Sequence, residues 1–433
     1  MKSKVLRNST EELYAALYEE EDARVCRDIP DEACSDVPQN FFLHAGAASL
    51  GKIADAIGSA KTTLPWLLAS VGAPVWMTTF LVPIRESGSM LPQLAIGAWV
   101  RQQRFRKGFY VIGALVQALA LLLAAGSLVV LEGAPAGFAV LVCLIFYSLA
   151  RALCSIASKD VIGKTVPKTR RGRMNGIAVS FAGLSTLAAV AMLAWLQAGT
   201  AAYLSLVACA AGCWLLAALV FSQIEESPGA TSGHGDGIAE ALSRLGLLRS
   251  DSTFRNFVVC RVLLLGSALM APLVVMLGQQ YGNTSLTWFL LAQGLGSALS
   301  GGLWGGFADR SSRKLMLFCA AGVFSMGTVL ALVAWFEFAP VYQVWFFPLA
   351  FLMLAVLHDG IRLGRKTYLL DMGGGNKRTD YVAVSNTVVG ALLLVAGVVT
   401  SLIQMLGVAF AIAFFAVLAL ASVPVMRSLP EVQ

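Results

Sequence analysis

The sequence predicts an all-α integral membrane protein, with twelve transmembrane helices arranged as two pseudo-symmetric six-helix bundles. Of its 433 residues, 57% are hydrophobic and only 13% are charged, whereas a soluble domain has roughly 25% charged residues. Twelve apolar stretches approach the roughly 20 residues that a helix needs to cross a bilayer. They are too long and too uniformly apolar for barrel strands, and a helix satisfies its own backbone hydrogen bonds in lipid.

The predicted spans form two sets of six on either side of a hydrophilic linker. The first set covers 43–71, 74–100, 108–131, 136–158, 174–197 and 200–223. The second set covers 256–280, 284–307, 314–336, 341–361, 382–405 and 407–426. The predicted domains are an acidic cytoplasmic N-terminal segment (1–42), a first bundle (43–224), a cytoplasmic linker (225–255), a second bundle (256–427) and a cytoplasmic tail (428–433).

The segment 1–42 is polar and acidic. Ser9 and Glu12 have the spacing of a capping box, which predicts the start of a short helix. The acidic run 19–22 favours a solvated cytoplasmic helix over an anchor on an anionic membrane. No function follows from this segment.

The distribution of basic residues predicts the orientation. All but five of the 32 lysines and arginines lie in the two tails, in the linker or in loops that follow even-numbered spans. Cytoplasmic loops carry such an excess of lysine and arginine, so we expect both termini in the cytoplasm. The same pattern explains the net charge of +7 without a nucleic-acid partner.

A glycine-rich helix end carries the most specific motif of the chain. The stretch from Gly305 to Lys314 reads GxxxDRxxRK, and a decayed copy begins at Gly97, half a chain earlier. Each copy follows the second span of its half. The motif residues are Gly305, Asp309, Arg310, Arg313 and Lys314 in the second copy, and Gly97, Arg101 and Arg104 in the first.

These paired loops resemble the signature loops of the major facilitator superfamily of transporters. The resemblance implies that Asp309, Arg310 and Arg313 act as a gate at the cytoplasmic face, because an acid at a helix end can pair with another helix in one state and release it in the other. In the first copy Arg101 occupies the acid position, so we expect the latch to depend on the second copy. The alternative is that these bases only enforce topology. The fifth span lacks the Gly-Pro pair associated with antiporter-type exporters.

Ionisable residues within the spans are candidates for proton coupling. A charge at mid-bilayer costs about 2.5–3.5 kcal/mol on insertion scales, so each needs a partner, a wet cavity or a function. Glu86 is the main candidate for the coupling carboxylate, with Arg151 and Asp55 as its partners in the network. Arg85 and Glu86 point about 100° apart on a helix, so we expect each to face a neighbouring helix. The alternative is a fixed salt bridge between the second and fourth spans.

The resemblance also implies that the first, fourth, seventh and tenth spans line a central cavity. Candidate lining residues are Arg151, Arg261, Lys52 or Lys61, Gln93, Gln293 and His358. Arginine binds carboxylate or phosphate in a bidentate manner, so an anionic substrate is a hypothesis. Alternatively, the lysines and Arg261 snorkel to headgroups, the glutamines join helices, and His358 belongs to a solvated helix end with Asp359 and Arg362.

Together these features predict a secondary active transporter that moves a small solute by alternating access. We expect proton coupling, because no GxxxxGK[ST] nucleotide-binding motif is present. We also expect a monomer in a bacterial inner membrane, with no cofactor, no metal and no catalytic residue. Three scattered histidines argue against a membrane enzyme. The degenerate first motif leaves a non-transporting receptor or assembly scaffold as the alternative.

Overall fold

The computed structural model describes residues 34–195, 199–229, 231, 245–281, 284–337, 343–372 and 377–432. The predicted capping box at Ser9 lies outside these ranges, as do residues 230 and 232–244 of the predicted linker. Within them every regular element is a helix. The first half contains α3 (Val37–Ile57), α4 (Thr63–Ser70), α5 (Val75–Met90), α6 (Gln93–Arg101), α7 (Lys107–Val130), α8 (Gly133–Thr165), α9 (Lys168–Trp195) and α10 (Thr200–Ser222).

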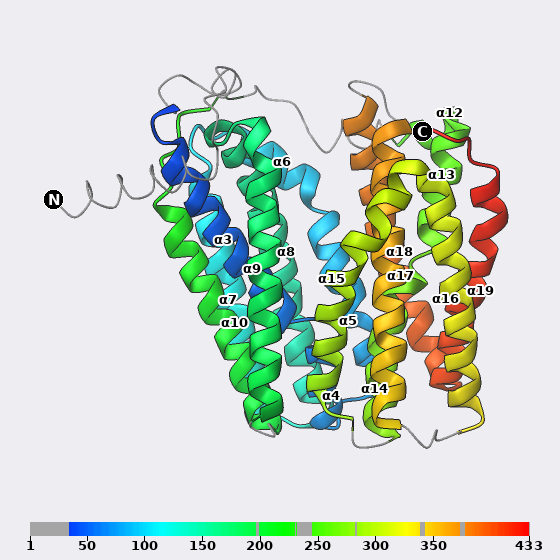
Figure 1. Cartoon of the computed structure of the whole chain (residues 1–433). Coiled ribbons are helices and arrows are strands. Elements are labelled where there is room, and N and C mark those ends of the chain that lie inside the picture. Colours follow the sequence, from blue (N-terminus) through cyan, green and yellow to red (C-terminus); the bar gives the residue numbers. More distant parts are fainter. Residues whose placement is uncertain are drawn as a thin grey trace.

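The second half repeats this plan. It contains α12 (Leu247–Ser250), α13 (Ser252–Leu263), α14 (Gly266–Gln280), α15 (Leu286–Arg310), α16 (Ser312–Trp335), α17 (Gln343–Met372), α18 (Lys377–Gln404) and α19 (Val408–Arg427). In each half the third spanning helix packs on the fourth and the sixth: α7 contacts α8 and α10, and α16 contacts α17 and α19. Figure 1 shows these helices aligned along one common axis.

Within the described residues, nine spans are long and apolar enough to cross a membrane, with α13 and α14 counted as one. The first predicted span is instead divided into α3 and α4, and the second into α5 and α6 at Pro92. The eighth predicted span, α15, is also not among the nine; it is rich in glycine and ends in charged residues. With the first, second and eighth predicted spans added to these nine, the arrangement is consistent with the predicted twelve.

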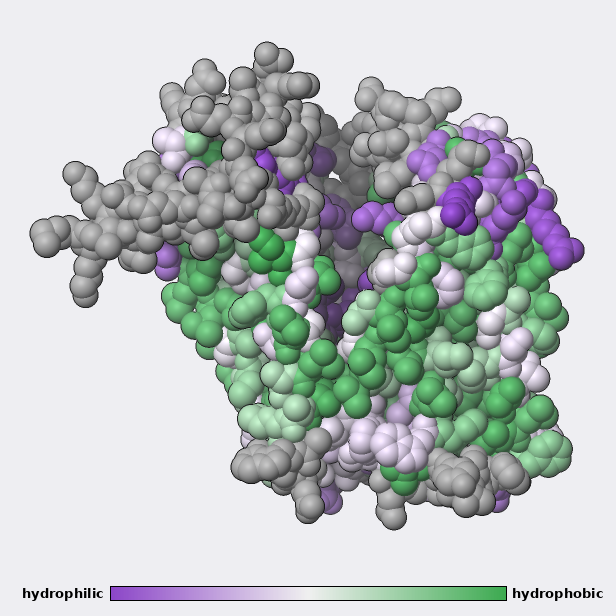
Figure 2. Space-filling model, viewed as in Figure 1, coloured by the Kyte–Doolittle hydropathy of each residue, from purple (hydrophilic) through white to green (hydrophobic). Residues whose placement is uncertain are grey.

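The outer surface has the hydropathy expected in a bilayer. Figure 2 shows a broad hydrophobic band across both halves on the face in view, with hydrophilic residues gathered at one end and between the halves. Leu123, Phe146 and Leu184 are 56%, 57% and 68% exposed. In water such a band would strongly favour aggregation, whereas in lipid it costs nothing. The fold is therefore that of an integral membrane protein.

The two halves meet along α5 with α18 and along α9 with α15, and α14 also contacts α4 and α5. Glycines allow the backbones of α5 and α18 to approach closely. A Cβ placed on Gly397 would lie 3.0 Å from Pro83, and one on Gly390 would lie 3.1 Å from Leu91. The hydroxyl of Ser87 also donates to the carbonyl of Gly390 at 2.7 Å.

Several helices extend further than predicted, α8 and α17 the furthest. α8 continues to Thr165 and α17 to Met372, past the predicted ends at 158 and 361. Charged residues that resemble a loop in the sequence are thus the polar ends of long helices. The prediction that His358 lies at a helix end is wrong, because it lies in the middle of α17.

Candidate functional site: a polar cavity between the halves

A cavity of about 260 Å³ lies between the two halves. α3 and the turn after it, together with α5 and α8, line the cavity from the first half, and α14, α15 and α17 line it from the second. We call the end of the molecule where α3 begins and α19 ends the tail side. Figure 2 shows a hollow between the halves on this side, with hydrophilic residues inside it.

Asp55 on α3 is the most strongly bound carboxylate of the cavity. Arg85 of α5 donates to it through Nη2 at 2.7 Å, and Arg151 of α8 donates to its other oxygen. The Tyr147 hydroxyl donates to Asp55 at 2.8 Å and accepts from the indole N–H of Trp214 at 3.2 Å. Two arginines and a tyrosine therefore hold this carboxylate in one position.

Glu86 lies beside this cluster with fewer contacts. Its Oε1 is 3.4 Å from Nη1 of Arg85, which is long for a charge-assisted hydrogen bond. Arg85 thus pairs mainly with Asp55 on a neighbouring helix, as expected, and touches Glu86 only weakly. Arg151 also pairs with Asp55 rather than with Glu86. Glu86 is the less constrained of the two carboxylates.

Polar groups of α17 face the first half across the cavity. The Ser267 hydroxyl donates to the carbonyl of Leu264 at 2.8 Å and lies 3.0 Å from Nδ1 of His358. Because that hydroxyl hydrogen is already used, we assign Nδ1 of His358 as the donor. Asp359 accepts from Ser300 at 3.1 Å and pairs with Arg362 at 3.1 Å.

Hydrogen bonds join the halves at the inner end of the cavity, away from the tail side. Oε1 of Gln293 accepts from the hydroxyls of Ser59 at 3.2 Å and of Thr62 at 3.3 Å. Further out, the hydroxyls of Tyr203 and Thr287 lie 3.3 Å apart. The cavity is therefore closed on the far side and open on the tail side.

Three predicted lining residues lie elsewhere. Arg261 is buried and donates to Ser385 and, at 2.9 Å, to Asn386 on α18. Lys52 has an exposed side chain outside the cavity lining, and Gln93 donates to the carbonyl of Ser89 at 2.7 Å. The second predicted lysine, Lys61, lines the cavity instead. Of the other predicted residues, Asp55, Glu86, Arg151, Gln293 and His358 line the cavity together.

The second motif loop is bound within its own half. Arg313 donates to the carbonyl of Leu429 at 2.7 Å and pairs with Glu431 at 2.9 Å. The Ser311 hydroxyl donates to Glu431 and also accepts from the backbone nitrogen of Lys314. Arg310 is exposed, Gly305 has open space around it, and the side chain of Asp309 lies outside the described residues.

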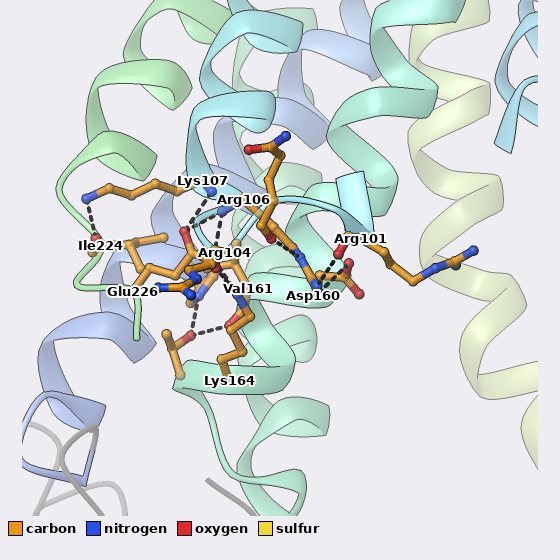
Figure 3. A network of polar contacts seen from close by, with 12 residues as sticks. Arg101, Arg104, Arg106, Lys107, Asp160, Val161, Lys164, Ile224 and Glu226 are labelled. Atoms are coloured by element: carbon orange, nitrogen blue, oxygen red, sulfur yellow. Dashed lines mark hydrogen bonds and ion pairs between the residues drawn. The ribbon is translucent and has the colours of Figure 1, made fainter. Parts of the chain in front are cut away.

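The first motif loop binds a corresponding glutamate, Glu226 (Figure 3). Its side chain is fully buried and accepts the backbone N–H groups of Arg106 and Lys107, each at 2.8 Å, at the start of α7. Lys164 of α8 pairs with the same carboxylate at 2.8 Å. An anion at a helix N-terminus also interacts favourably with the helix dipole.

The two loops correspond more closely than the sequence motif suggests. In each half a glutamate that follows the sixth spanning helix binds at the start of the third, so Arg106-Lys107 correspond to Arg313-Lys314. The first copy therefore contains one additional residue. Arg101 and Arg104, the predicted motif residues of the first copy, have exposed side chains. The sequence contained a signal for this correspondence between the two Arg-Lys pairs, because each pair directly precedes an apolar run.

Comparison with solved structures identifies the fold. A D-xylose-proton symporter superposes with a TM-score of 0.68 at 13% identity, over 91% of this chain and 98% of that chain. A POT family transporter in complex with a thioalcohol-conjugated peptide gives 0.66 at 12%, over 93% and 97%. The nucleoside transporter NupG gives 0.61 at 12%, over 90% and 98%. No protein-family model and no curated protein sequence matches the chain.

These similarities establish the fold of the chain. The chain has the fold of the major facilitator transporters. The structures compared above are named a D-xylose-proton symporter, a POT family transporter and a nucleoside transporter, and each is similar to this chain over nearly its whole length.

Proposed function

We propose that this protein is a proton-coupled secondary transporter that moves a small organic anion by alternating access. The polar cavity between the two halves carries this proposal. It combines a carboxylate cluster at membrane depth with four cations, on a fold whose halves can rock about a central site. One similar structure is named a D-xylose-proton symporter, which supports proton coupling on this fold.

The lining charges support an anionic substrate. The cations are Lys61, Arg85, Arg151 and Arg362, and the acids are Asp55, Glu86 and Asp359. With His358 neutral, the lining carries one positive charge in excess. A cavity with this balance binds a monoanion with less electrostatic penalty than a cation.

Glu86 and Asp55 have different roles in this proposal. Asp55 already accepts three side-chain donors, so its pairs with Arg85 and Arg151 must rearrange before it takes up a proton. Glu86 has one long contact with Arg85 and can take up a proton without breaking a strong ion pair. We assign Glu86 as the proton carrier, with Arg151 and Asp55 as the pair that responds to substrate.

We place the protein in a bacterial inner membrane as a monomer, with both termini cytoplasmic. The basic loops support this orientation. It makes the tail side the cytoplasmic side and the structure inward-facing. We keep the domain boundaries proposed from the sequence, with bundles at 43–224 and 256–427.

Flux measurements test the function. Purified protein would be reconstituted in liposomes that contain a pH-sensitive dye, and organic anions, cations and neutral solutes would each be added under a proton gradient. We expect substrate-dependent proton flux with anions, which Glu86→Gln abolishes. Substrate movement without proton flux would contradict proton coupling but leave a carrier. No movement of any solute by folded protein would contradict transport itself.

A non-transporting receptor or scaffold is the second candidate function. It is favoured by one observation, the basic Arg101 at the acid position of the first motif. A stable partner retained through purification, together with an absence of flux, would support it. Retained flux would exclude it.

A further inference from the structure

Lys61 is the one lining cation without a partner among the residues that the structure describes. Arg85 and Arg151 pair with Asp55, and Arg362 pairs with Asp359. The ammonium of Lys61 makes no hydrogen bond and no ion pair with any described residue. Its charge is balanced only at a distance, by Glu86 and Asp359. A charged group inside a membrane protein needs a partner, a wet cavity or a function, so an ammonium without a partner in this cavity is a candidate for binding a ligand.

The local backbone explains how Lys61 comes to lie in the cavity. α3 ends at Ile57 and α4 begins at Thr63, so residues 58–62 break the helix in the middle of the first span. Non-helical backbone at membrane depth is tolerated where it is buried in protein or lines a water-filled cavity. Ser59 and Lys61 of this break line the cavity. In transporters such interrupted helices mark substrate sites.

We propose that Lys61 is the residue that binds the anionic group of the substrate, and that the substrate is a small monocarboxylate. This inference rests on the proposed transport function and assigns its substrate class. One carboxylate on Lys61 neutralises both the unpaired ammonium and the excess positive charge of the lining. A neutral solute would leave Lys61 unpaired. A dianion would change the one excess positive charge of the cavity into one excess negative charge.

The rest of the cavity fits a small polar acid. Its volume of about 260 Å³ lies below the range of roughly 300–1,000 Å³ typical of drug-sized ligands. Gln293 and Ser297 are placed to bond hydroxyl or carbonyl groups, and Phe351 and Leu354 supply an apolar wall. The hydroxyls of Ser59 and Thr62 both bond the amide oxygen of Gln293. The amide nitrogen of Gln293 makes no hydrogen bond to any described residue.

Matched pairs of acids and amides test the proposal. Lactate, 3-hydroxybutyrate and gluconate would each be compared with the corresponding primary amide in uptake by proteoliposomes. The variants are Lys61→Met, Lys61→Arg and the control Arg249→Met, which removes an exposed charge on α12, away from the cavity. Size-exclusion profiles and circular dichroism establish that each variant is folded.

We expect wild type and Arg249→Met to take up at least one acid and to discriminate against its amide. Lys61→Met should lower acid uptake by about 10- to 100-fold, the range of a lost charge-assisted hydrogen bond. Its uptake of the amide should change little, so the discrimination should disappear. Lys61→Arg keeps the charge and should restore most of the acid uptake.

Three outcomes would overturn the proposal. In the first, folded Lys61→Met takes up the acids as wild type does. In the second, it loses acid and amide uptake equally, which would make Lys61 a structural or gating residue. In the third, wild type moves cations or neutral solutes but none of the acids, which would remove the monocarboxylate while leaving the carrier function intact. Silence of wild type toward every solute would instead remove the transport function on which this inference rests.

Discussion

Asp55 lies 2.7 Å from Nη2 of Arg85, although the neighbour of Arg85 in sequence is another carboxylate, Glu86. The helix directs Arg85 toward α3 and leaves Glu86 with a contact of 3.4 Å. Asp55 also pairs with Arg151. One carboxylate therefore joins three helices of the first half, while the other faces the cavity with little restraint.

This difference predicts opposite effects of two conservative substitutions. Asp55→Asn leaves Arg85 and Arg151 without their counter-ion and should destabilise the protein by about 3 kcal/mol. Glu86→Gln removes one long contact and should change stability by less than about 1 kcal/mol, while abolishing proton flux. Thermal unfolding in detergent, followed by tryptophan fluorescence, measures the difference in stability between the two variants. Equal melting temperatures for the two variants would contradict the conclusion that Asp55 is the more strongly bound of the two carboxylates.

The buried carboxylate of Glu226 carries a second prediction. It binds Lys164 and two backbone N–H groups at the start of α7. Glu226→Gln loses the ion pair and the charge at the helix N-terminus, and should destabilise the first half by about 1–3 kcal/mol. Glu225→Gln is the matched control, because this adjacent side chain is exposed. Toward the described residues, Glu225 bonds through its backbone alone, to Asn40. If both variants melt alike, the Glu226 network contributes no stability.

Arg106, rather than Arg104, should be the important base of the first motif loop. Arg106 pairs with Asp160 at 3.1 Å and donates to the carbonyl of Arg101, whereas the side chain of Arg104 is exposed. We expect Arg106→Gln to lower the melting temperature and the transport rate, and Arg104→Gln to leave both near wild type. Flux and thermal unfolding of both variants measure this. A larger defect in Arg104→Gln than in Arg106→Gln would contradict the correspondence of Arg106 with Arg313.

The fold was predictable because the membrane imposes a simple pattern on sequence. Long apolar runs and basic residues in alternate loops indicate a helical membrane protein before any contact is known. Helix ends were less predictable: Lys159 and Lys164 resemble a loop, yet they extend α8 beyond the apolar region. Hydropathy detects the part of a helix that lies in lipid and not the part that continues into water.

The cavity lining was predictable only in part, for two physical reasons. The break at 58–62 interrupts the helical period of the first span, so Lys52 and Lys61 cannot be placed relative to each other by counting residues. Arg261 was predicted to face the cavity but donates to Ser385 and Asn386 of the neighbouring helix. A sequence states which residues are charged. It does not state which residues they pair with, because the partners lie on helices that are distant in the chain.

Gln293 should control which side of the cavity is open. Its Oε1 accepts from Ser59 and Thr62, which join the two halves on the far side of the cavity. Gln293→Leu removes this acceptor while keeping similar volume, so the far side should open more often and the inward-facing population should fall. Loss of two neutral hydrogen bonds, about 1–3 kcal/mol together, is enough to shift a two-state equilibrium by roughly 5- to 150-fold.

Spin labels report this shift directly. One label would replace Thr200 at the start of α10 and another Ser285 before α15, both at the far side, in a background without native cysteines. Electron–electron distance measurements on wild type should show one short population, and Gln293→Leu should add a longer one. Gln279→Leu provides the control, because Gln279 lies at the end of α14 and outside the cavity lining. An unchanged distance distribution in Gln293→Leu would show that apolar packing, such as Trp66 against Phe289, closes the far side without these hydrogen bonds.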